Sequence, residues 1–189
     1  MSIEQDDIKV NLKGFVGHEL VHSNDSDDEI TLVGSGTPAG EYLRRYWQPV
    51  FISSELDDLP VAIKILGEEL VLFRDKSNQL GLVHKHCPHR QASLEFGICH
   101  ETGIQCCYHG WHFDGEGSCK RIPSIGKEAK IPKRAKIDAY PTEEKYGLVF
   151  CFLGDIPKKE RCPILEIKEF EMEGWTITNQ KLAFDIDYK

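Results

Sequence analysis

Two short stretches carry the residues that decide the fold: Cys87-Pro88-His89-Arg90 and Cys106-Cys107-Tyr108-His109-Gly110-Trp111. Their cysteines and histidines form the pattern Cys87-x-His89, sixteen intervening residues, then Cys106-x-x-His109. Each stretch offers one thiolate and one imidazole, so two such loops facing each other would make a site of two Cys and two His ligands. Zinc and iron–sulfur chemistry both accept that donor set.

The distribution of the donors bears on the choice between these two chemistries. A zinc site usually takes like ligands from one loop, as in Cys-x2-4-Cys with His-x3-5-His, whereas each loop here carries one of each kind. The mixed arrangement favours a dinuclear centre with two thiolates on one iron and two imidazoles on the other. A zinc-stapled interaction module is the alternative.

The composition limits the kind of protein that carries these loops. The chain has 189 residues, of which 40% are hydrophobic and 29% charged, so it has room for one good-sized soluble domain plus something smaller. Its net charge of -8 has the wrong sign for neutralising phosphates, so no nucleic-acid partner is expected. No apolar run approaches the roughly 18 residues that span a bilayer, and Met1–Val10 is acidic, so we expect a cytoplasmic protein without membrane association.

The order of sequence patterns predicts an all-β unit between two tails. Residues 1–30 form an acidic arm with eight acids and two bases. A short helix is predicted from Thr37 as N-cap and Pro38 as first helical residue, ending at Pro49. Short antiparallel strands follow, with tight turns at Gly67-Glu68, 75–79 and 114–117. The predicted strands are 61–66, 69–74, 80–86, 103–107, 137–140 and 148–153.

The last part of the chain reads differently. From Gly154 the pattern breaks into a stretch with Pro157 and Pro163, which predicts a domain boundary near 155–165. Leu182, Phe184 and Ile186 then alternate with polar residues, as in a half-buried strand. Because a lone strand is not stable by itself, it is expected to pack on the first domain or to open a domain that this chain lacks.

The two loops and their surroundings resemble the Rieske [2Fe-2S] family. The resemblance implies a Rieske-type antiparallel β-sandwich or barrel over residues 31–156, with Cys87 and Cys106 on one iron and His89 and His109 on the other. Two ferric ions, two sulfides and two thiolates sum to zero charge, which implies a reduction potential of roughly -150 to +300 mV. The matching positions are 87–90, 92–94, 97, 106–111, 113–114, 117 and 122–123.

Flanking residues are similar to those of phthalate-dioxygenase-type Rieske non-heme iron oxygenases. Rieske proteins of respiratory complexes carry an extra disulfide between the loops, whereas Ala92 and Tyr108 stand near those positions here. Residues 34–50, 139–142 and 146–149 also look like the oxygenase class. Gln91 departs from the pattern, because the family commonly has Gly there; if the turn needs a positive φ, Gln costs on the order of 1 kcal/mol.

The resemblance also implies a second domain. In the family, a catalytic domain follows and holds a mononuclear Fe(II) on two His and a carboxylate, but an acid followed by His-x4-5-His occurs nowhere here, and no His lies beyond His112. Residues 157–189 are therefore expected to be a linker and the first strand of a missing α+β catalytic domain. The chain alone is expected to be inactive.

Electron-transfer partners follow from the same resemblance. They are an NAD(P)H-dependent flavin/iron–sulfur reductase or a ferredoxin, and the catalytic domain of the same or a neighbouring subunit in a homotrimer. His109 would lie nearest a bridging Asp of that neighbour, with both His ligands exposed and both Cys ligands buried. The full enzyme would use O2 to hydroxylate or demethylate an aromatic or similar cyclic substrate. The alternative is a stand-alone Rieske ferredoxin, against which the extra helix and the C-terminal strand argue.

The remaining Cys and His residues are assigned structural roles. Trp111 is expected to shield the cluster, and Tyr108 to do the same or to donate a hydrogen bond to a cluster sulfur. Cys151 is expected in the core, as part of an apolar strand. The other members of this group are the free thiols Cys99, Cys107, Cys119 and Cys162 and the loop or surface residues His84, His86, His100 and His112.

Overall fold

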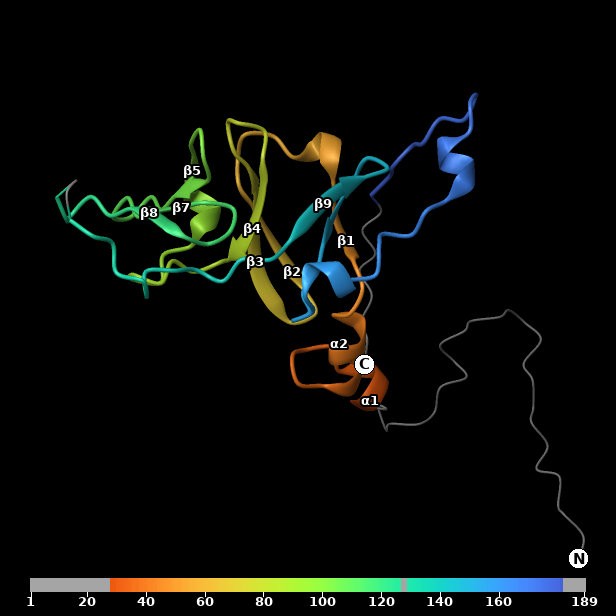
Figure 1. Ribbon diagram of the computed structural model, residues 1–189, viewed down its shortest axis with the longest axis horizontal. Coiled ribbons are helices and arrows are strands. Elements are labelled where there is room, and N and C mark those ends of the chain that lie inside the picture. Colours follow the sequence, from red (N-terminus) through yellow and green to blue (C-terminus); the bar gives the residue numbers. More distant parts are fainter. Residues whose placement is uncertain (1–27, 127–128, 182–189) are drawn as a thin grey trace, which may run out of the picture.

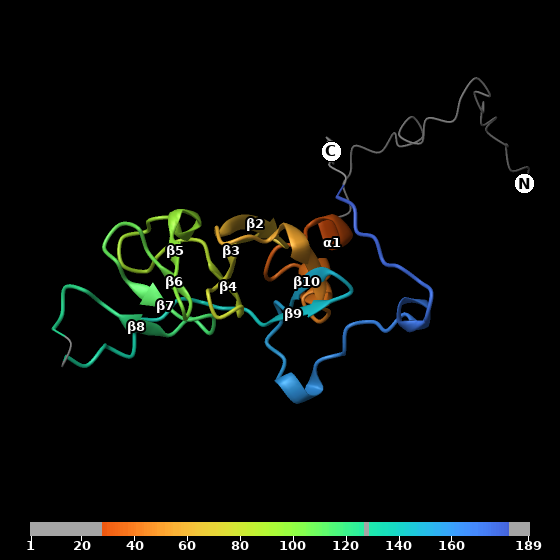
Figure 2. The same ribbon diagram turned by 90° about the horizontal axis from the view of Figure 1, so that it is seen from above.

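A computed structural model describes residues 28–126 and 129–181 and shows three antiparallel sheets side by side (Figures 1 and 2). Most of the acidic arm and the predicted strand at Leu182–Ile186 lie outside the described residues. The sheets have the orders β1-β10-β9, β2-β3-β4 and β5-β6-β7-β8, with β2-β3-β4 in the middle. The predicted all-β class is confirmed.

The helices at the start of the described chain are short. Helix α1 spans Asp28–Thr31, and α2 spans Pro38–Leu43 with the Thr37 side chain accepting a hydrogen bond from the Gly40 N–H, so the predicted N-cap is confirmed. The prediction that Pro49 ends this helix is wrong. Pro49 lies in β1 (Gln48–Ile52), which is an edge strand, where a residue without an N–H is tolerated.

Strands β1, β9 and β10 form one sheet, which contains both the first and the last strand of the β unit. Strand β9 (Thr142–Lys145) and β10 (Leu148–Cys151) form a hairpin, and β10 pairs with β1 so that Gln48 lies opposite Cys151. The first and last strands of the unit are therefore direct neighbours.

The central sheet consists of β2 (Val61–Ile65), β3 (Glu68–Arg74) and β4 (Leu80–His84). The β2–β3 turn lies one residue earlier than predicted, at Leu66 and Gly67, with φ of 46° and 82°. Two consecutive positive φ angles are the signature of the hairpin turn whose twist matches that of the strands.

Strand β3 separates two hydrophobic cores. Alternate residues point to opposite faces of a strand, and four consecutive residues of β3 are fully buried. Leu70 and Leu72 pack with Leu82, Val149 and Cys151 in one core. Val71 and Phe73 pack in the other, which also contains both candidate ligand cysteines; its further members include Val83, Leu94, Ile104 and Phe113.

The third sheet consists of very short strands. These are β5 (Ile98–Cys99), β6 (Ile104–Gln105), β7 (His112–Phe113) and β8 (Cys119–Arg121). The continuous strand predicted at 137–140 is not formed. That segment instead makes a single bridge from Ala139 to Val83, close to another from Lys136 to Ser118.

The first part of the segment after β10 packs against residues of the β unit. The Trp47 indole N–H donates to the Cys162 carbonyl oxygen (2.9 Å), and the Arg161 guanidinium lies over the Phe152 ring, 4.9 Å from its centroid. Short 3-10 turns follow at Lys158–Glu160 and Lys168–Glu171. The boundary at 156/157 stays a prediction. Within residues 28–126 and 129–181 no helix is long and apolar enough to cross a membrane.

Candidate metal centre

The two Cys/His loops share one backbone design. In the first loop the Cys87 N–H donates to the Ala92 carbonyl and the Gln91 N–H donates to the Cys87 carbonyl, both at 2.9 Å. In the second loop the Cys106 N–H donates to the Trp111 carbonyl (2.8 Å) and the Gly110 N–H to the Cys106 carbonyl (3.0 Å). Each loop is thus a six-residue ring that begins at a cysteine.

The fifth residue of each ring has a left-handed backbone. The φ angle is 59° at Gln91 and 70° at Gly110. A positive φ is strained for any residue but glycine, so Gln91 costs on the order of 1 kcal/mol of stability. This is the cost predicted from the sequence for a turn that requires a positive φ at this position. At Gly110 a side chain would also press on Pro123, because an added Cβ would lie 2.9 Å from the Pro123 Cγ.

The fold separates the four candidate ligands by type. Cys87 and Cys106 are 1% and 2% exposed and belong to one hydrophobic core. His89 is half-buried and His109 exposed, and their ring centroids are 4.8 Å apart. The thiols therefore lie together inside the protein and the imidazoles lie together toward solvent.

Burial and neighbouring groups alter the acidity of these side chains. Burial raises the pKa of the Cys87 thiol to about 11, with a further increase from Cys106 and an opposing effect of the N–H groups of His89 and Arg90. Burial, His109 and Arg90 lower the pKa of His89. A buried thiol pair needs a bound cation to become thiolate, and a neutral imidazole is the form that binds metal.

This donor set fits a [2Fe-2S] group with two thiolates on one iron and two imidazoles on the other. The thiols are paired in the core and the imidazoles are paired outside it, as that ligation requires. In the described part of the chain, no group of three or more His, Cys, Asp or Glu side chains is arranged to hold a single metal ion. The ligation described above needs only two side chains on each iron.

Comparison with known proteins agrees with this chemistry. Residues 46–141, just over half of the chain, match the family model described as the Rieske [2Fe-2S] domain. The chain belongs to the Rieske [2Fe-2S] family. The predicted resemblance is confirmed.

Relatives of this Rieske domain include subunits of oxygenases. It is 50% identical over 138 residues to the "Tert-butanol monooxygenase / tert-amyl alcohol desaturase oxygenase subunit" of Aquincola tertiaricarbonis, covering 73% of this chain and 29% of the relative. It is 47% identical over 148 residues to the "Phenoxybenzoate dioxygenase subunit alpha" of Ectopseudomonas oleovorans, covering 78% and 36%. The chain therefore spans about a third of the length of these relatives.

A solved structure shows the same fold. Dicamba monooxygenase with non-heme iron and dicamba superposes with a TM-score of 0.59 at 28% identity, over 69% of this chain and 40% of that one.

Two aromatic side chains cover the imidazoles of the Rieske domain. The Trp111 indole stacks on the His89 ring with an interplanar angle of 8° and a centroid distance of 4.8 Å; its expected role as a shield of the cluster stays a prediction. The Tyr108 ring lies 3.8 Å from that of His109, centroid to centroid, and is 62% exposed. Tyr108 therefore packs on the ring of a candidate ligand at the surface.

Among the other cysteines, Cys99 lies in the same hydrophobic core as Cys87 and Cys106, and Cys119 packs against that core. All seven cysteines are free thiols, and Cys151 is fully buried, which raises the pKa of its thiol to about 12. The remaining ring contacts join neighbouring histidines in two pairs, with centroid distances of 5.8 and 5.2 Å; these are His84 with His86 and His100 with His112.

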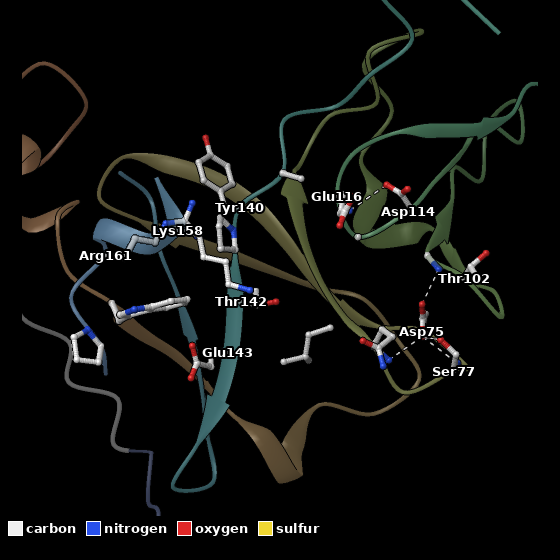
Figure 3. Close-up of a pocket in the computed structure, with 18 of the residues that line it drawn as sticks. Asp75, Ser77, Thr102, Asp114, Glu116, Tyr140, Thr142, Glu143, Lys158 and Arg161 are labelled. Carbon is white, nitrogen blue, oxygen red and sulfur yellow. Dashed lines mark hydrogen bonds between the residues drawn. The ribbon is translucent and has the colours of Figure 1, made fainter. Parts of the chain in front are cut away.

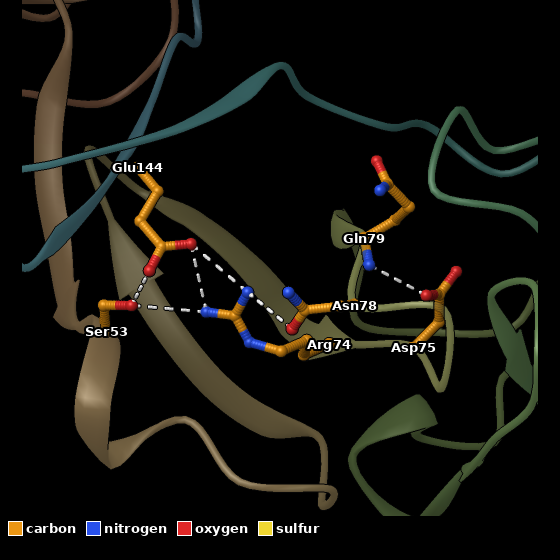
Figure 4. Close-up of polar contacts among 6 residues, drawn as sticks. All are labelled: Ser53, Arg74, Asp75, Asn78, Gln79 and Glu144. Carbon is orange, nitrogen blue, oxygen red and sulfur yellow. Dashed lines mark hydrogen bonds and ion pairs between the residues drawn. The ribbon is translucent and has the colours of Figure 1, made fainter.

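Sequence reasoning missed Asp75, which holds the Gly103 turn just before β6. This carboxylate is 8% exposed and accepts hydrogen bonds from the Ser77 N–H and hydroxyl, the Gln79 N–H and the Gly103 N–H. Figure 4 shows the bond from Gln79. Burial alone would raise the pKa of Asp75, but these hydrogen bonds outweigh it and hold the pKa below its usual value. The pattern Asp75-x-Ser77 is typical of a turn and could have predicted the hydrogen bonds within that turn. It could not have predicted the hydrogen bond from the Gly103 N–H.

A second polar cluster ties β3 to β9. The Arg74 guanidinium contacts the Glu144 carboxylate at 3.2 Å and donates to the Ser53 hydroxyl at 3.2 Å, and Ser53 also donates to Glu144 (Figure 4). Arg74 and Asp75 are adjacent in sequence but serve different neighbours. Arg74 stabilises the sheet formed by β1, β10 and β9. Asp75 stabilises the part of the β unit that carries the Rieske loops.

One cleft of the described structure lies apart from the candidate ligands. It has a volume of about 800 Å³ and lies between the Asp75 turn, Tyr140 on the segment before β9, and Lys158 and Arg161 of the following segment (Figure 3). None of the four candidate ligands lines it. This cleft is separate from the Rieske site.

Proposed function

We propose that this chain is the electron-transfer part of a Rieske non-heme iron oxygenase. In this proposal Cys87 and Cys106 bind one iron of the [2Fe-2S] cluster, and His89 and His109 bind the other. The supporting observation is the pair of matched six-residue rings that places two thiols in a core and two imidazoles outside it. When bound, the cluster would supply reversible one-electron transfer.

The residues of the chain hold, orient and shield this site. The backbone hydrogen bonds that close each ring fix the positions of both cysteines. The N–H groups of His89 and Arg90 point at the Cys87 sulfur, and such hydrogen bonds raise the potential of an iron–sulfur site. Stacking on Trp111 orients the His89 ring, whereas the exposed His109 ring offers the shortest route to a partner.

The activity of the whole enzyme follows from the relatives. Their names are those of a monooxygenase and desaturase subunit and a dioxygenase subunit, and dicamba monooxygenase was solved with non-heme iron. We therefore infer O2-dependent hydroxylation or demethylation of an aromatic or similar cyclic substrate at a mononuclear Fe(II) held by a domain outside this chain. The chain alone is not expected to turn over substrate.

The proposed partners and location follow the same inference. An NAD(P)H-dependent flavin/iron–sulfur reductase or a ferredoxin would supply electrons in the cytoplasm. The catalytic domain of the same or a neighbouring subunit in a homotrimer would accept them. Relatives named as oxygenase subunits support a system of several components.

Metal analysis and spectroscopy of the anaerobically purified chain test the assignment. We expect two irons and two sulfides per chain, a red-brown colour, and a reduced-state EPR signal with an average g value below that of the free electron. Cys106→Ser should abolish the signal, whereas Cys107→Ser, which changes the exposed neighbouring thiol, should leave it intact. A colourless protein with one zinc, or an equal loss of signal in Cys107→Ser, would refute the proposal.

A further inference from the structure

A cluster of positive charge lies beside the second Rieske loop. Residues 120–136 contain seven Lys or Arg residues and one acid, in a chain whose net charge is -8. Six of these bases lie in the described part of the chain and all six are exposed. We call them the basic strip: Lys120, Arg121, Lys130, Lys133, Arg134 and Lys136.

The charge of the basic strip is not neutralised by the described part of the molecule. Lys120 forms an ion pair with Asp114 at 2.8 Å. None of the other five makes a salt bridge with a described residue. Because like charges repel, such a cluster is unfavourable for the isolated domain and favours contact with an acidic surface.

Buried neighbours hold the basic strip against the Rieske lobe. Ile122 and Ala135 are each 6% exposed, and the Cys119 N–H donates to the Ala135 carbonyl. Pro123 lies against Gly110 of the second loop, and Arg121 is opposite His112 in the β7–β8 ladder. Both ends of the strip are therefore anchored next to the second loop, close to Gly110, which follows the exposed His109.

The basic strip also faces away from the exit of the chain. In both views the segment beyond β8 lies at one end of the molecule, and the segment after β10 lies at the other (Figures 1 and 2). The described segment after β10 therefore does not cover the strip.

The surface next to the strip suits a protein better than a nucleic acid. A hollow of about 610 Å³ has apolar lining residues, Ile122, Pro123, Ile125 and Ile131, beside Lys120 and Arg121. Apolar side chains beside charged ones are the usual composition of a protein interface.

From this charge, position and composition we infer that the basic strip docks an acidic electron-donor protein next to His109. The inference rests on the proposed function, because it assumes that the four ligands hold a cluster that must be reduced from outside. In the transfer step, one electron leaves the reduced donor and reduces one ferric ion of the cluster to ferrous. Charge complementarity would mainly accelerate encounter and orient the donor.

Stopped-flow reduction tests the inference with a reduced plant-type [2Fe-2S] ferredoxin of net negative charge as the donor probe. The variant K130Q/K133Q/R134Q should lower the second-order rate constant about tenfold at low salt, and this difference should vanish at high salt. Its matched control is K64Q/K158Q/K159Q, which removes the same charge from exposed residues elsewhere and should change the rate less than twofold. Calorimetric binding of the oxidised ferredoxin should weaken in the first variant only.

Separate measurements identify which idea has failed. If the purified chain lacks the reduced-state EPR signal, the proposed function is wrong and the inference falls with it. If the signal is present and dithionite reduces both variants, equal ferredoxin rates for the two variants would refute the inference alone. Loss of oligonucleotide binding in the strip variant, with unchanged ferredoxin binding, would likewise refute it and assign the strip to nucleic acid.

Discussion

Replacing Asp75 by Asn should destabilise the domain through the loss of one long-range hydrogen bond. Asp75 accepts three hydrogen bonds within its own turn through one oxygen and a fourth, from the buried Gly103 N–H, through the other. If the Asn side-chain oxygen accepts the three hydrogen bonds of the turn, the Asn side-chain NH2 group must face the Gly103 N–H. Two hydrogen-bond donors would then face each other, and the Gly103 N–H would lose its acceptor.

The magnitude follows from these four bonds. An unsatisfied buried donor costs about 1–3 kcal/mol, and the three remaining bonds lose the assistance of a charge, which adds about 1 kcal/mol or more. We therefore expect Asp75→Asn to lower the free energy of unfolding by about 3 kcal/mol, a large fraction of the roughly 5–15 kcal/mol of a typical domain.

The pH dependence of the free energy of unfolding gives a second test of the role of Asp75. Because the folded pKa of Asp75 is held below its usual value, its stabilising effect is fully present above the unfolded pKa, about 3.9, and is lost as the pH falls through the folded pKa. The difference in stability between the protein and Asp75→Asn should therefore narrow as the pH falls below about 4.

Urea denaturation of the cluster-loaded protein, followed by circular dichroism, measures both effects. Asp57→Asn is the matched control, because Asp57 is exposed and hydrogen-bonds to no described residue; it should change the free energy of unfolding by less than about 0.5 kcal/mol. A loss below about 1 kcal/mol for Asp75→Asn, or a loss that is constant between pH 7 and pH 3, would contradict the argument.

Other substitutions and reagents test the backbone and the cores. Gln91→Gly should raise the free energy of unfolding by up to about 1 kcal/mol, because glycine relieves the φ of 59°; calorimetry would show a lower Tm if this is wrong. Gly103→Ala should prevent stable folding, seen as loss of the near-ultraviolet circular dichroism signal, because its φ is 86° and an added Cβ would overlap the Phe113 carbonyl. Iodoacetamide should label Cys107 readily at pH 8, and equal labelling of Cys151 in the folded protein would contradict its burial and its raised pKa.

The sequence predicted the parts of the structure that depend on local spacing. The positions of the six-residue rings follow from the Cys and His pattern, and the central strands follow from alternating or continuous apolar residues. The condition attached to Gln91, a positive φ, is met because the ring closure at Cys87 forces the fifth residue into that region.

The errors occur where tertiary pairing overrides local preference. Pro49 was expected to end a helix, but pairing of β1 with β10, a hundred residues away, places it in an edge strand. Residues 137–140 have strand-like composition, yet they contact β4 at one bridge only. Asp75 has a partner 28 residues away at Gly103, which no local pattern encodes.

The adjacency of β1 and β10 has a consequence for how such domains are distributed among proteins. Hydrogen-bonded strands are about 4.8 Å apart, so the polypeptide enters and leaves the β unit at nearly the same point. A host fold needs only a surface loop with closely spaced ends to accept the whole unit as an insertion or a fusion. The unit can thus be transferred as a whole: chimeras joined just before Trp47 and just after Cys162, which keep the buried Phe152 and Leu153, should retain its fold in an unrelated carrier.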